Sequence, residues 1–388
     1  MLVRGKRVLK NGVSAGYVYN KKTKKWKWSF LKGGYNSNYI DVDNLNNIIL
    51  SFYKNSGYDY ELKRDVIQLD GNSNYRNMID DFSTYSRIFF ESLLQSGNVN
   101  TIFNSGSIKG KYDKYIKETA QFGNIFKKKR NMFHDILISF YLYTTNLYNE
   151  INPLVRKHFN FGHFKMNKLN LSNIIDKVRD VSKSFSGKNK EKFMKRTYQP
   201  NFDQMKNISV LIDMKNGNRK NSLMESFKQH KYSIFDTIYF MYLGYYLIIN
   251  TFDQLIPSKD IFLYRSSGQE VYKNFKRNLN INQSQISNSS VLSTTVRPLS
   301  LFQFLAGNNK VIEIIKVVKG VMPIVLVDSI SRFEGEKEVI LPFSIKRDIV
   351  AVNNYENDNY DLKIDDALFP KKGNFKATKI YFSLLNPY

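Results

Sequence analysis

Three glutamates, Glu334, Glu336 and Glu338, stand close together in the stretch FEGEKEVILP, directly before the apolar run Val-Ile-Leu. They stand out because the chain is strongly basic, with 59 Lys and Arg against 34 Asp and Glu and a net charge of +25. Grouped carboxylates can stabilise a positive charge that develops during a reaction, or take a proton from a nucleophile. The stretch is therefore a candidate site for chemistry that passes through a cation, with Glu334 expected in a solvated loop position.

Two other apolar runs end in residues that could bind or orient a substrate. Arg265 follows the run IFLY, and Ser293, Thr294 and Thr295 follow Val-Leu in NSSVLSTTV. Taken singly, each has an ordinary explanation, since an arginine at a strand end is usually solvated and Ser-Thr-Thr is common in turns. Taken together with the glutamates, in this order along the chain, they form a series.

The series resembles the Arg…Ser-Thr-Ser…Glu-x-Glu motif of mono-ADP-ribosyltransferases. The segment YTTNLYNEINPLVR (143–156) is similar to the helical segment before the catalytic sheet in that family. Residues 311–342 follow the family's order of strand, glycine turn, strand, loop and Glu-x-Glu strand. The likeness covers about residues 111–388, with 157–232 as a helical or loop insertion. It implies an α+β fold, in which helices precede a split, mixed or antiparallel, ADP-ribosyltransferase-like β core.

The resemblance implies a role for each of these residues in a reaction of NAD⁺. Glu338 would stabilise the oxocarbenium-like ribose formed when the bond to nicotinamide breaks, as in glycoside hydrolysis, and Ser293 would orient Glu338 and the nicotinamide end. Glu336 would hold or deprotonate the acceptor, and we expect it on the same side as Glu338 because side chains alternate along an extended chain. Arg265 would pair with a phosphate of NAD⁺. The resemblance further places Tyr264, Thr294 and Arg297 at NAD⁺ and Phe333 at the acceptor.

The implied activity is transfer of ADP-ribose from NAD⁺ to a protein arginine with release of nicotinamide, because relatives with Glu-x-Glu in place of Gln-x-Glu modify arginine. An NAD⁺ glycohydrolase side activity, with water as acceptor, is expected as well. Two positions depart from the family pattern: Thr295 is the third residue of the Ser-Thr-Ser motif, and Ser266 follows the arginine where many relatives have glycine. No metal is expected, since the chain has no cysteine and only four histidines, of which His158 and His163 are the closest pair.

Residues 1–70 are predicted to form a small basic module, and residues 71–388 the ADP-ribosyltransferase-like domain. The first forty residues contain ten Lys or Arg and no Asp or Glu. KRVLKNG, AGYVYNKKTKK and WKWSFLKGG are typical of three strands, and apolar spacing predicts a helix between about residue 43 and Gly57. Such a module suits either nucleic acid or docking to another protein. Two alternatives therefore stay open: a nucleic-acid-associated ADP-ribosyltransferase, and a structural or virion-associated protein that keeps the fold with little activity.

The rest of the pattern predicts helices followed by a sheet. Helical spacing occurs over 83–96 and 108–148, a buried helix over about 232–256, and strands in IFLY, VIEIIKVV, PIVLV, EVIL, RDIVAV and TKIYFSLL. The longest apolar segment, 237–249, is too short to span a bilayer, and MLVRGKRVLK has no apolar signal core. We therefore expect an intracellular or virion-associated protein, and the Asn-, Lys- and Ile-rich composition suggests an AT-rich genome such as that of a large DNA virus.

Overall fold

The structure is a computed structural model of the chain, and it describes the following residues. They are 3–8, 14–20, 25–30, 58–63, 66–71, 73–94, 131–159, 171–185, 196–200, 205, 207–210, 227, 230–267, 285–288, 290–297, 300, 311–333, 335–354, 360–365, 373–377 and 379–385. Side chains are described for a subset of these, which begins at residue 77.

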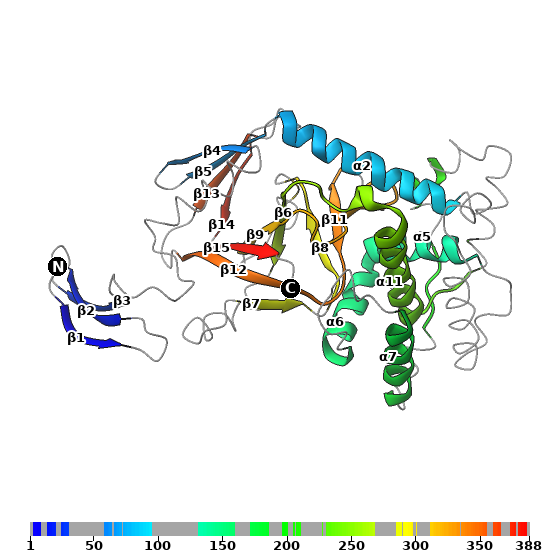
Figure 1. Cartoon of the computed structure of the whole chain (residues 1–388), viewed down its shortest axis with the longest axis horizontal. Coiled ribbons are helices and arrows are strands. Elements are labelled where there is room, and N and C mark those ends of the chain that lie inside the picture. Colours follow the sequence, from blue (N-terminus) through cyan, green and yellow to red (C-terminus); the bar gives the residue numbers. More distant parts are fainter. Residues whose placement is uncertain are drawn as a thin grey trace.

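An eight-stranded sheet forms the centre of the fold (Figure 1). Its strands are β6 (Ile261–Ser267), β7 (Gln285–Asn288), β8 (Leu292–Thr295), β9 (Val311–Val317), β10 (Val325–Leu326), β11 (Glu338–Leu341), β12 (Ile345–Asn354) and β15 (Lys379–Leu385). Their order across the sheet is β10-β11-β8-β6-β9-β15-β12-β7. β9 and β15 run parallel, whereas the other neighbouring strands run antiparallel. All the strands predicted after Pro257 lie in this sheet.

The sheet has two halves that meet between β8 and β6. β8 pairs along its length with β11, from Leu292 opposite Leu341 to Thr295 opposite Glu338. β6 pairs along its length with β9. Between β6 and β8, however, the pairing is limited to Tyr264 opposite Thr295. The two halves can therefore diverge on either side of this one pair. It is also the point where β6, which carries Arg265, meets β8, which carries Ser293.

Two smaller sheets contain the N-terminal strands. β1 (Val3–Val8), β2 (Ser14–Asn20) and β3 (Lys25–Phe30) form an antiparallel sheet, as the sequence predicts. The second sheet has the order β14-β13-β5-β4, and consists of β4 (Tyr58–Lys63), β5 (Val66–Gly71), β13 (Tyr360–Asp365) and β14 (Gly373–Ala377). β5 runs parallel to β13. The domain boundary predicted at residue 70 thus falls inside β5, a strand that pairs with β13 in the C-terminal part of the chain. The division into domains otherwise stays a prediction. The helix predicted before Gly57 lies outside the described residues.

Helices gather beside the β10, β11 and β8 end of the large sheet (Figure 1). They are α2 (Ser73–Leu94), α5 (Met132–Leu142), the π-helical turn η3 (Tyr143–Leu147), α6 (Tyr148–His158), α7 (Leu171–Ser184), α11 (Ile234–Thr251) and the 3₁₀ turn η8 (Asp253–Leu255). α2 begins ten residues before the predicted start at residue 83, and its first turns already carry apolar residues at helical spacing, Met78, Ile79 and Phe82, of which Ile79 and Phe82 are buried. The predicted segment 108–130 lies outside the described residues.

Helix α11 follows from its sequence. Ser233 and Asp236 form a capping box at its start: the Asp236 backbone N–H donates to Ser233 Oγ at 3.1 Å, and the Ser233 N–H donates to Asp236 Oδ2 at 2.8 Å. The helix is apolar on nearly all sides and is correspondingly buried. This confirms the buried helix that the sequence predicts.

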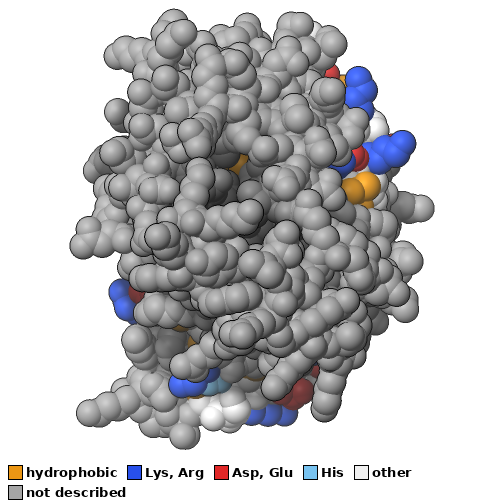
Figure 2. All heavy atoms as spheres, turned by 90° about the vertical axis from the view of Figure 1, so that its left-hand side faces the viewer, with side chains coloured by type: hydrophobic (Ala, Val, Ile, Leu, Met, Phe, Trp, Pro, Cys, Tyr) orange, Lys and Arg blue, Asp and Glu red, His pale blue; other side chains and the backbone are white. Residues whose placement is uncertain are grey.

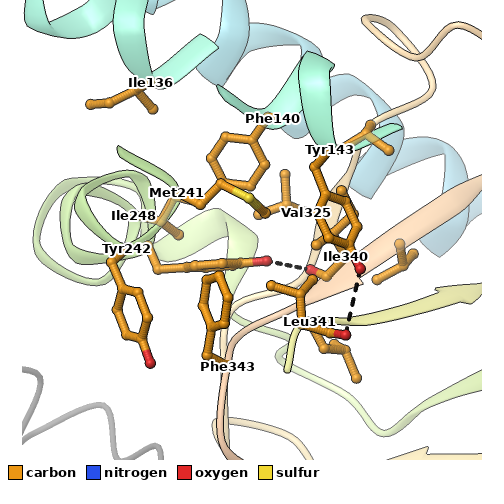
Figure 3. Packing of buried hydrophobic residues seen from close by; sticks show 14 of the residues in the cluster. Ile136, Phe140, Tyr143, Met241, Tyr242, Ile248, Val325, Ile340, Leu341 and Phe343 are labelled. Carbon is orange, nitrogen blue, oxygen red and sulfur yellow. Dashed lines mark hydrogen bonds between the residues drawn. The ribbon is translucent and has the colours of Figure 1, made fainter. Parts of the chain in front are cut away.

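The hydrophobic core joins these helices to the strands of the candidate site. Figure 3 shows Phe140, Tyr143 and Met241 of the helices packed around Ile340 and Leu341 of β11. The Tyr245 hydroxyl, on α11, donates to Ile340 O at 2.7 Å, and on α2 Ser86 Oγ accepts from the Leu326 backbone N–H at 3.0 Å. Helices beside a mixed, largely antiparallel sheet confirm the predicted α+β class.

Within the described part of the chain, no helix is both long and apolar enough to cross a membrane. The face that lies to the left in Figure 1 is turned toward the viewer in Figure 2. The few described side chains visible at its margins include both Lys or Arg and Asp or Glu (Figure 2).

Candidate active site

The three parts of the sequence motif lie on three consecutive strands of the large sheet. Glu338 is the first residue of β11, Ser293 is the second residue of β8, and Arg265 is on β6. The β11–β8 register places Ser293 opposite Ile340 and Thr295 opposite Glu338. Ser293 and Glu338 are therefore diagonal neighbours across an antiparallel pair, within reach of their side chains.

A chain of two hydrogen bonds connects these residues. The Ser293 hydroxyl donates to Glu338 Oε1 at 2.5 Å. The Arg265 guanidinium donates through Nη1 to the Ser293 backbone oxygen at 2.9 Å. The first bond is short, as expected when a hydroxyl meets a carboxylate. Arg265, Ser293 and Glu338, which are far apart in the sequence, thus converge on one part of the sheet.

The environment of Glu338 makes its carboxyl harder to ionise. Burial raises the pKa of Glu338 from 4.5 to about 7, the Ser293 hydrogen bond lowers that pKa, and the nearby Glu336 charge raises it. A carboxyl with a pKa near neutrality, held by a hydroxyl donor, is typical of a functional position.

Glu336 is close to Glu338, but the reason derived from the sequence is wrong. β11 begins at Glu338, and Lys337 has a φ of +49°, in the left-handed region. The Glu-x-Glu segment is therefore not extended, and strand alternation does not apply to Glu336, which lies in the preceding loop. Burial and the charge of Asp328 raise the pKa of Glu336 above its ordinary value. The loop, and not a strand, brings the second carboxyl to the site.

Thr295 and Arg297 hold the loop against the end of β8. The Thr295 hydroxyl donates to Glu336 O at 2.7 Å and accepts from the Arg297 backbone N–H at 2.9 Å. Arg297 is buried, and its Nη1 donates to Gly335 O at 2.8 Å. Gly335 has a φ of +81°, which only glycine adopts without cost. Threonine at the third motif position therefore fixes the backbone of the Glu-x-Glu segment.

The remaining predicted site residues occupy different surroundings. Tyr264 and Thr294 are buried within the protein, and Thr294 Oγ1 donates to Val339 O at 3.0 Å. Phe333 is 43% exposed, and the Arg332 guanidinium lies 5.3 Å from its ring centroid. NAD⁺ contacts of Tyr264, Thr294 and Arg297, and an acceptor contact of Phe333, stay predictions. Glu334 and His163 lie outside the described residues.

The helical segment 143–156 approaches the same strands through Tyr143 and Asn152. The Tyr143 hydroxyl accepts from Asn152 Nδ2 at 3.1 Å and donates to Val291 O at 3.5 Å, at the start of β8. Burial raises the pKa of Tyr143 well above 10, with a further contribution from the charge of Glu338. Among the described residues, Asn152 Oδ1 is a buried atom with no hydrogen-bond partner. The π-helical turn at Tyr143, a feature that often marks functional sites, orients this side of the site.

Asp328 is a site residue that the sequence analysis did not identify. Its Oδ1 accepts from the Gly335 backbone N–H at 3.2 Å, and its Oδ2 accepts from Lys337 Nζ at 2.9 Å. The sequence did contain a signal for Asp328, because this acid directly follows the apolar run PIVLV, just as Arg265 directly follows IFLY. Within the described residues, no group of three His, Cys, Asp or Glu side chains could hold a metal ion.

Comparison with known proteins gives distant structural likenesses. No protein-family model and no curated protein matches the sequence. The structure is similar to an ADP-ribosyltransferase from Clostridium botulinum, with 12% identity, 70% of this chain and 94% of that chain covered, and a TM-score of 0.33. It is similar to a protein from S. aureus that was solved with NAD, with 14% identity, 70% and 95% coverage and a TM-score of 0.32. The ADP-ribosylating toxin of a binary enterotoxin of C. perfringens, solved with NADH, gives 13% identity, 72% and 48% coverage and a TM-score of 0.33.

Proposed function

We propose that this chain is an NAD⁺-dependent mono-ADP-ribosyltransferase that transfers ADP-ribose to an arginine of an acceptor protein and releases nicotinamide. The observation that supports it most directly is the hydrogen-bonded series of Arg265, Ser293 and Glu338 on three neighbouring strands. Its order along the chain matches the family motif, and its geometry joins an anion-binding group to a carboxylate.

The residues present suit NAD⁺ as the substrate. Arg265 is partly exposed and offers a guanidinium for phosphate, for which its planar donors are well matched. A positively charged nicotinamide ring would favour the ionised form of Glu338 and so lower its pKa.

The reaction breaks the bond between ribose C1′ and the nicotinamide nitrogen. The electron pair of that bond leaves with nicotinamide, which becomes neutral, and positive charge develops on the ribose. The Glu338 carboxylate stabilises this charge, while Ser293 holds the carboxylate in place through the 2.5 Å hydrogen bond. Because the hydroxyl and the carboxylate are already fixed by the strands, little reorganisation accompanies the step.

The acceptor nitrogen then forms the new bond to C1′ and loses one proton. We assign Glu336 as the base that accepts this proton, because it lies in the loop directly before the strand that begins with Glu338. Its raised pKa, caused by burial and by Asp328, makes its carboxylate a better base than an ordinary glutamate. When water replaces arginine, the same ribose cation gives NAD⁺ hydrolysis.

Exchange of each glutamate for glutamine tests this division of roles. Glu338→Gln should lower both transfer to polyarginine and NAD⁺ hydrolysis by about 10²- to 10³-fold, the effect of losing one electrostatic stabiliser. Glu336→Gln should lower transfer to polyarginine by a similar factor and leave hydrolysis largely intact. Labelled NAD⁺ measures both products in one assay.

The controls separate a loss of chemistry from a loss of folding. Glu91→Gln, on α2, is a matched exchange outside the motif. Normal activity of Glu338→Gln would refute the assignment of the catalytic carboxylate. Equal loss of transfer and hydrolysis in Glu336→Gln would refute its role toward the acceptor.

Nucleic-acid association is the second candidate function. It is supported by the antiparallel sheet β1–β3, which lies in the most basic part of the chain, with ten Lys or Arg and no acidic residue in the first forty residues. Contacts with phosphates would make binding fall steeply with added salt. This candidate is compatible with the enzymatic one, and a truncation described below separates them.

A further inference from the structure

Thr295 and Arg297 hold residues 335–337 of the loop between β10 and β11, and the loop as a whole, residues 328–337, is also fixed in shape by side chains that do not belong to the motif. Asp328 accepts hydrogen bonds from the Gly335 backbone and from the Lys337 ammonium, so it links the first residue of the loop to its last three. Ser331 Oγ accepts from the Phe333 N–H at 3.1 Å. The loop is therefore closed on itself before any acceptor arrives.

Asn207 ties this loop to a distant part of the chain. Its Nδ2 donates to Ser331 O at 2.9 Å and to Asp328 O at 3.4 Å. It lies within the region 157–232 that the sequence analysis regarded as an insertion. The Asn207 amide thus donates to two backbone oxygens near the start of the loop, those of Asp328 and Ser331.

The backbone on either side of Asn207 is anchored in the hydrophobic core. Met205 and Ile208, on either side of it, are fully buried and belong to the hydrophobic core. The Ser209 backbone N–H donates to Met205 O at 2.9 Å, which closes a helical turn around Asn207. Because the backbone of this turn is anchored in the core, the amide acts as a fixed support and not as a mobile surface group.

Glu338 has different supports. It is paired through its strand to β8, and the Val327 backbone N–H donates to Glu338 O at 3.0 Å. Loss of the Asn207 hydrogen bonds would therefore loosen the first part of the loop, from Asp328 to Phe333, and through Asp328 also weaken the support of Gly335 and Lys337 on either side of Glu336, while Ser293 and Glu338 keep their positions. The two steps of the proposed reaction depend on separate parts of the structure.

From this arrangement we infer that Asn207 is a positioning residue for the acceptor. The inference rests on the proposed function, and it assigns to the region 157–232 a part in the choice of acceptor. Transfer requires the acceptor nitrogen to be held in line with C1′, so small displacements of the loop cost rate. Hydrolysis takes water from solvent and does not need the loop in one shape.

Asn207→Ala tests the inference through the ratio of two activities. Transfer to polyarginine, measured as kcat/KM, should fall about tenfold, the effect of losing two ordinary hydrogen bonds. NAD⁺ hydrolysis should stay within about twofold of the parent. Asn250→Ala is the matched control, because Asn250 Nδ2 donates to the Tyr246 backbone oxygen at 2.6 Å at an exposed position on α11. An equal fall of both activities in Asn207→Ala, or unchanged transfer, would overturn the inference.

Asn207→Asp distinguishes a lost hydrogen bond from lost volume. Aspartate keeps the size of asparagine but its oxygens cannot donate to Asp328 O and Ser331 O when it is ionised. It should therefore reproduce the selective loss of transfer. Normal transfer by Asn207→Asp would contradict the hydrogen-bonding role, and this variant also serves if Asn207→Ala fails to fold.

Amide hydrogen exchange supplies a readout that needs no activity. In Asn207→Ala and Asn207→Asp, exchange of the amides of residues 331–337 should be at least several-fold faster than in Asn250→Ala. Unchanged exchange would show that Asn207 does not support the loop. If the parent chain hydrolyses no NAD⁺, the proposed function fails, whereas the exchange experiment still decides whether Asn207 holds the loop.

Discussion

At the scale of single residues, the site balances forces that act on Glu338. Burial and the Glu336 charge oppose its ionisation, while the Ser293 hydroxyl favours it. The carboxylate is the form that stabilises a cation, so the proposed reaction needs the balance to allow ionisation near neutral pH. Ser293 therefore does more than orient the carboxylate, because it also determines how much of it is ionised.

The pH dependence of NAD⁺ hydrolysis should report this balance. The pKa of Glu338 is raised to about 7, so kcat/KM should fall as the pH drops through about 7 and the carboxylate becomes protonated. Ser293→Ala removes the interaction that lowers the pKa of Glu338, and the midpoint should move upward by about one pH unit. Ser92→Ala, on the exposed side of α2, should leave the midpoint in place. A midpoint that stays near 7 in Ser293→Ala would contradict this account.

Lys337 shows why residue-level reasoning from the sequence was incomplete. The sequence correctly located the glutamates at the start of a strand, but alternation required an extended residue between them. Lys337 is left-handed instead, at a cost of about 1–2 kcal/mol for a residue with a Cβ. Its ion pair with Asp328 and the hydrogen bonds of Thr295 hold this conformation in place. These contacts depend on residues from separate strands, and no local pattern contains them.

At the scale of elements, a buried polar network joins three strands of the large sheet. Arg347 on β12 donates to Glu313 on β9 through Nε at 2.6 Å and through Nη2 at 3.0 Å. Ser383 on β15 donates to Glu313 Oε1 at 2.7 Å. Glu313 also lies opposite Arg265 in the β6–β9 pair. The network thus fixes the register of the strands that support Arg265.

Arg347→Ala should destabilise the fold far more than loss of a surface ion pair. Arg347 and Glu313 are almost fully buried, so removing one partner leaves a buried charge uncompensated, which costs about 3–5 kcal/mol. Arg196→Ala removes the ion pair with Glu150 from a half-exposed arginine, and Glu150 keeps its hydrogen bond from the Tyr198 hydroxyl, so the loss should be no more than about 1 kcal/mol. Urea unfolding monitored by circular dichroism gives both values. Similar losses in the two variants would show that the buried network contributes little.

The sequence predicted elements where apolar periodicity was strong. The apolar runs after Pro257 became strands of the large sheet, and the segment around 237–249 became α11. The strands β4 and β5 were missed, because YDYELK and VIQLDG mix charged and apolar residues, and β5 pairs with β13, which lies far away in the sequence. Of the candidate site, Arg265, Ser293 and Glu338 were singled out because each adjoins an apolar run and because their order along the chain resembles the family motif, and their roles stay predictions. Asn207 could not, since its role comes from a contact with a loop more than one hundred residues away.

At the scale of the whole molecule, the second sheet joins two segments that lie far apart in the sequence. β4 and β5 precede all the described helices, yet β5 pairs along its length with β13 near the C-terminus. An N-terminal module that ended at residue 70 would cut through this sheet. The chain before residue 58 includes the basic strands β1–β3, which form a separate three-stranded sheet.

Two truncations should therefore behave differently. Removal of residues 1–57 keeps β4 and β5, so NAD⁺ hydrolysis and the melting temperature should stay close to those of the full chain. Removal of residues 1–70 deletes nearly all of both strands and leaves the backbone of β13 without its parallel partner, so the melting temperature should fall by several degrees.

The shorter truncation also separates the two candidate functions. If β1–β3 bind nucleic acid, affinity of the full chain for a DNA duplex should fall steeply between 50 and 200 mM salt, and most of it should be lost on removal of residues 1–57. Fluorescence anisotropy measures this without reference to catalysis. Equal melting temperatures for the two truncated chains would contradict the pairing of β5 with β13. Loss of NAD⁺ hydrolysis on removal of residues 1–57 would place these residues within the catalytic unit.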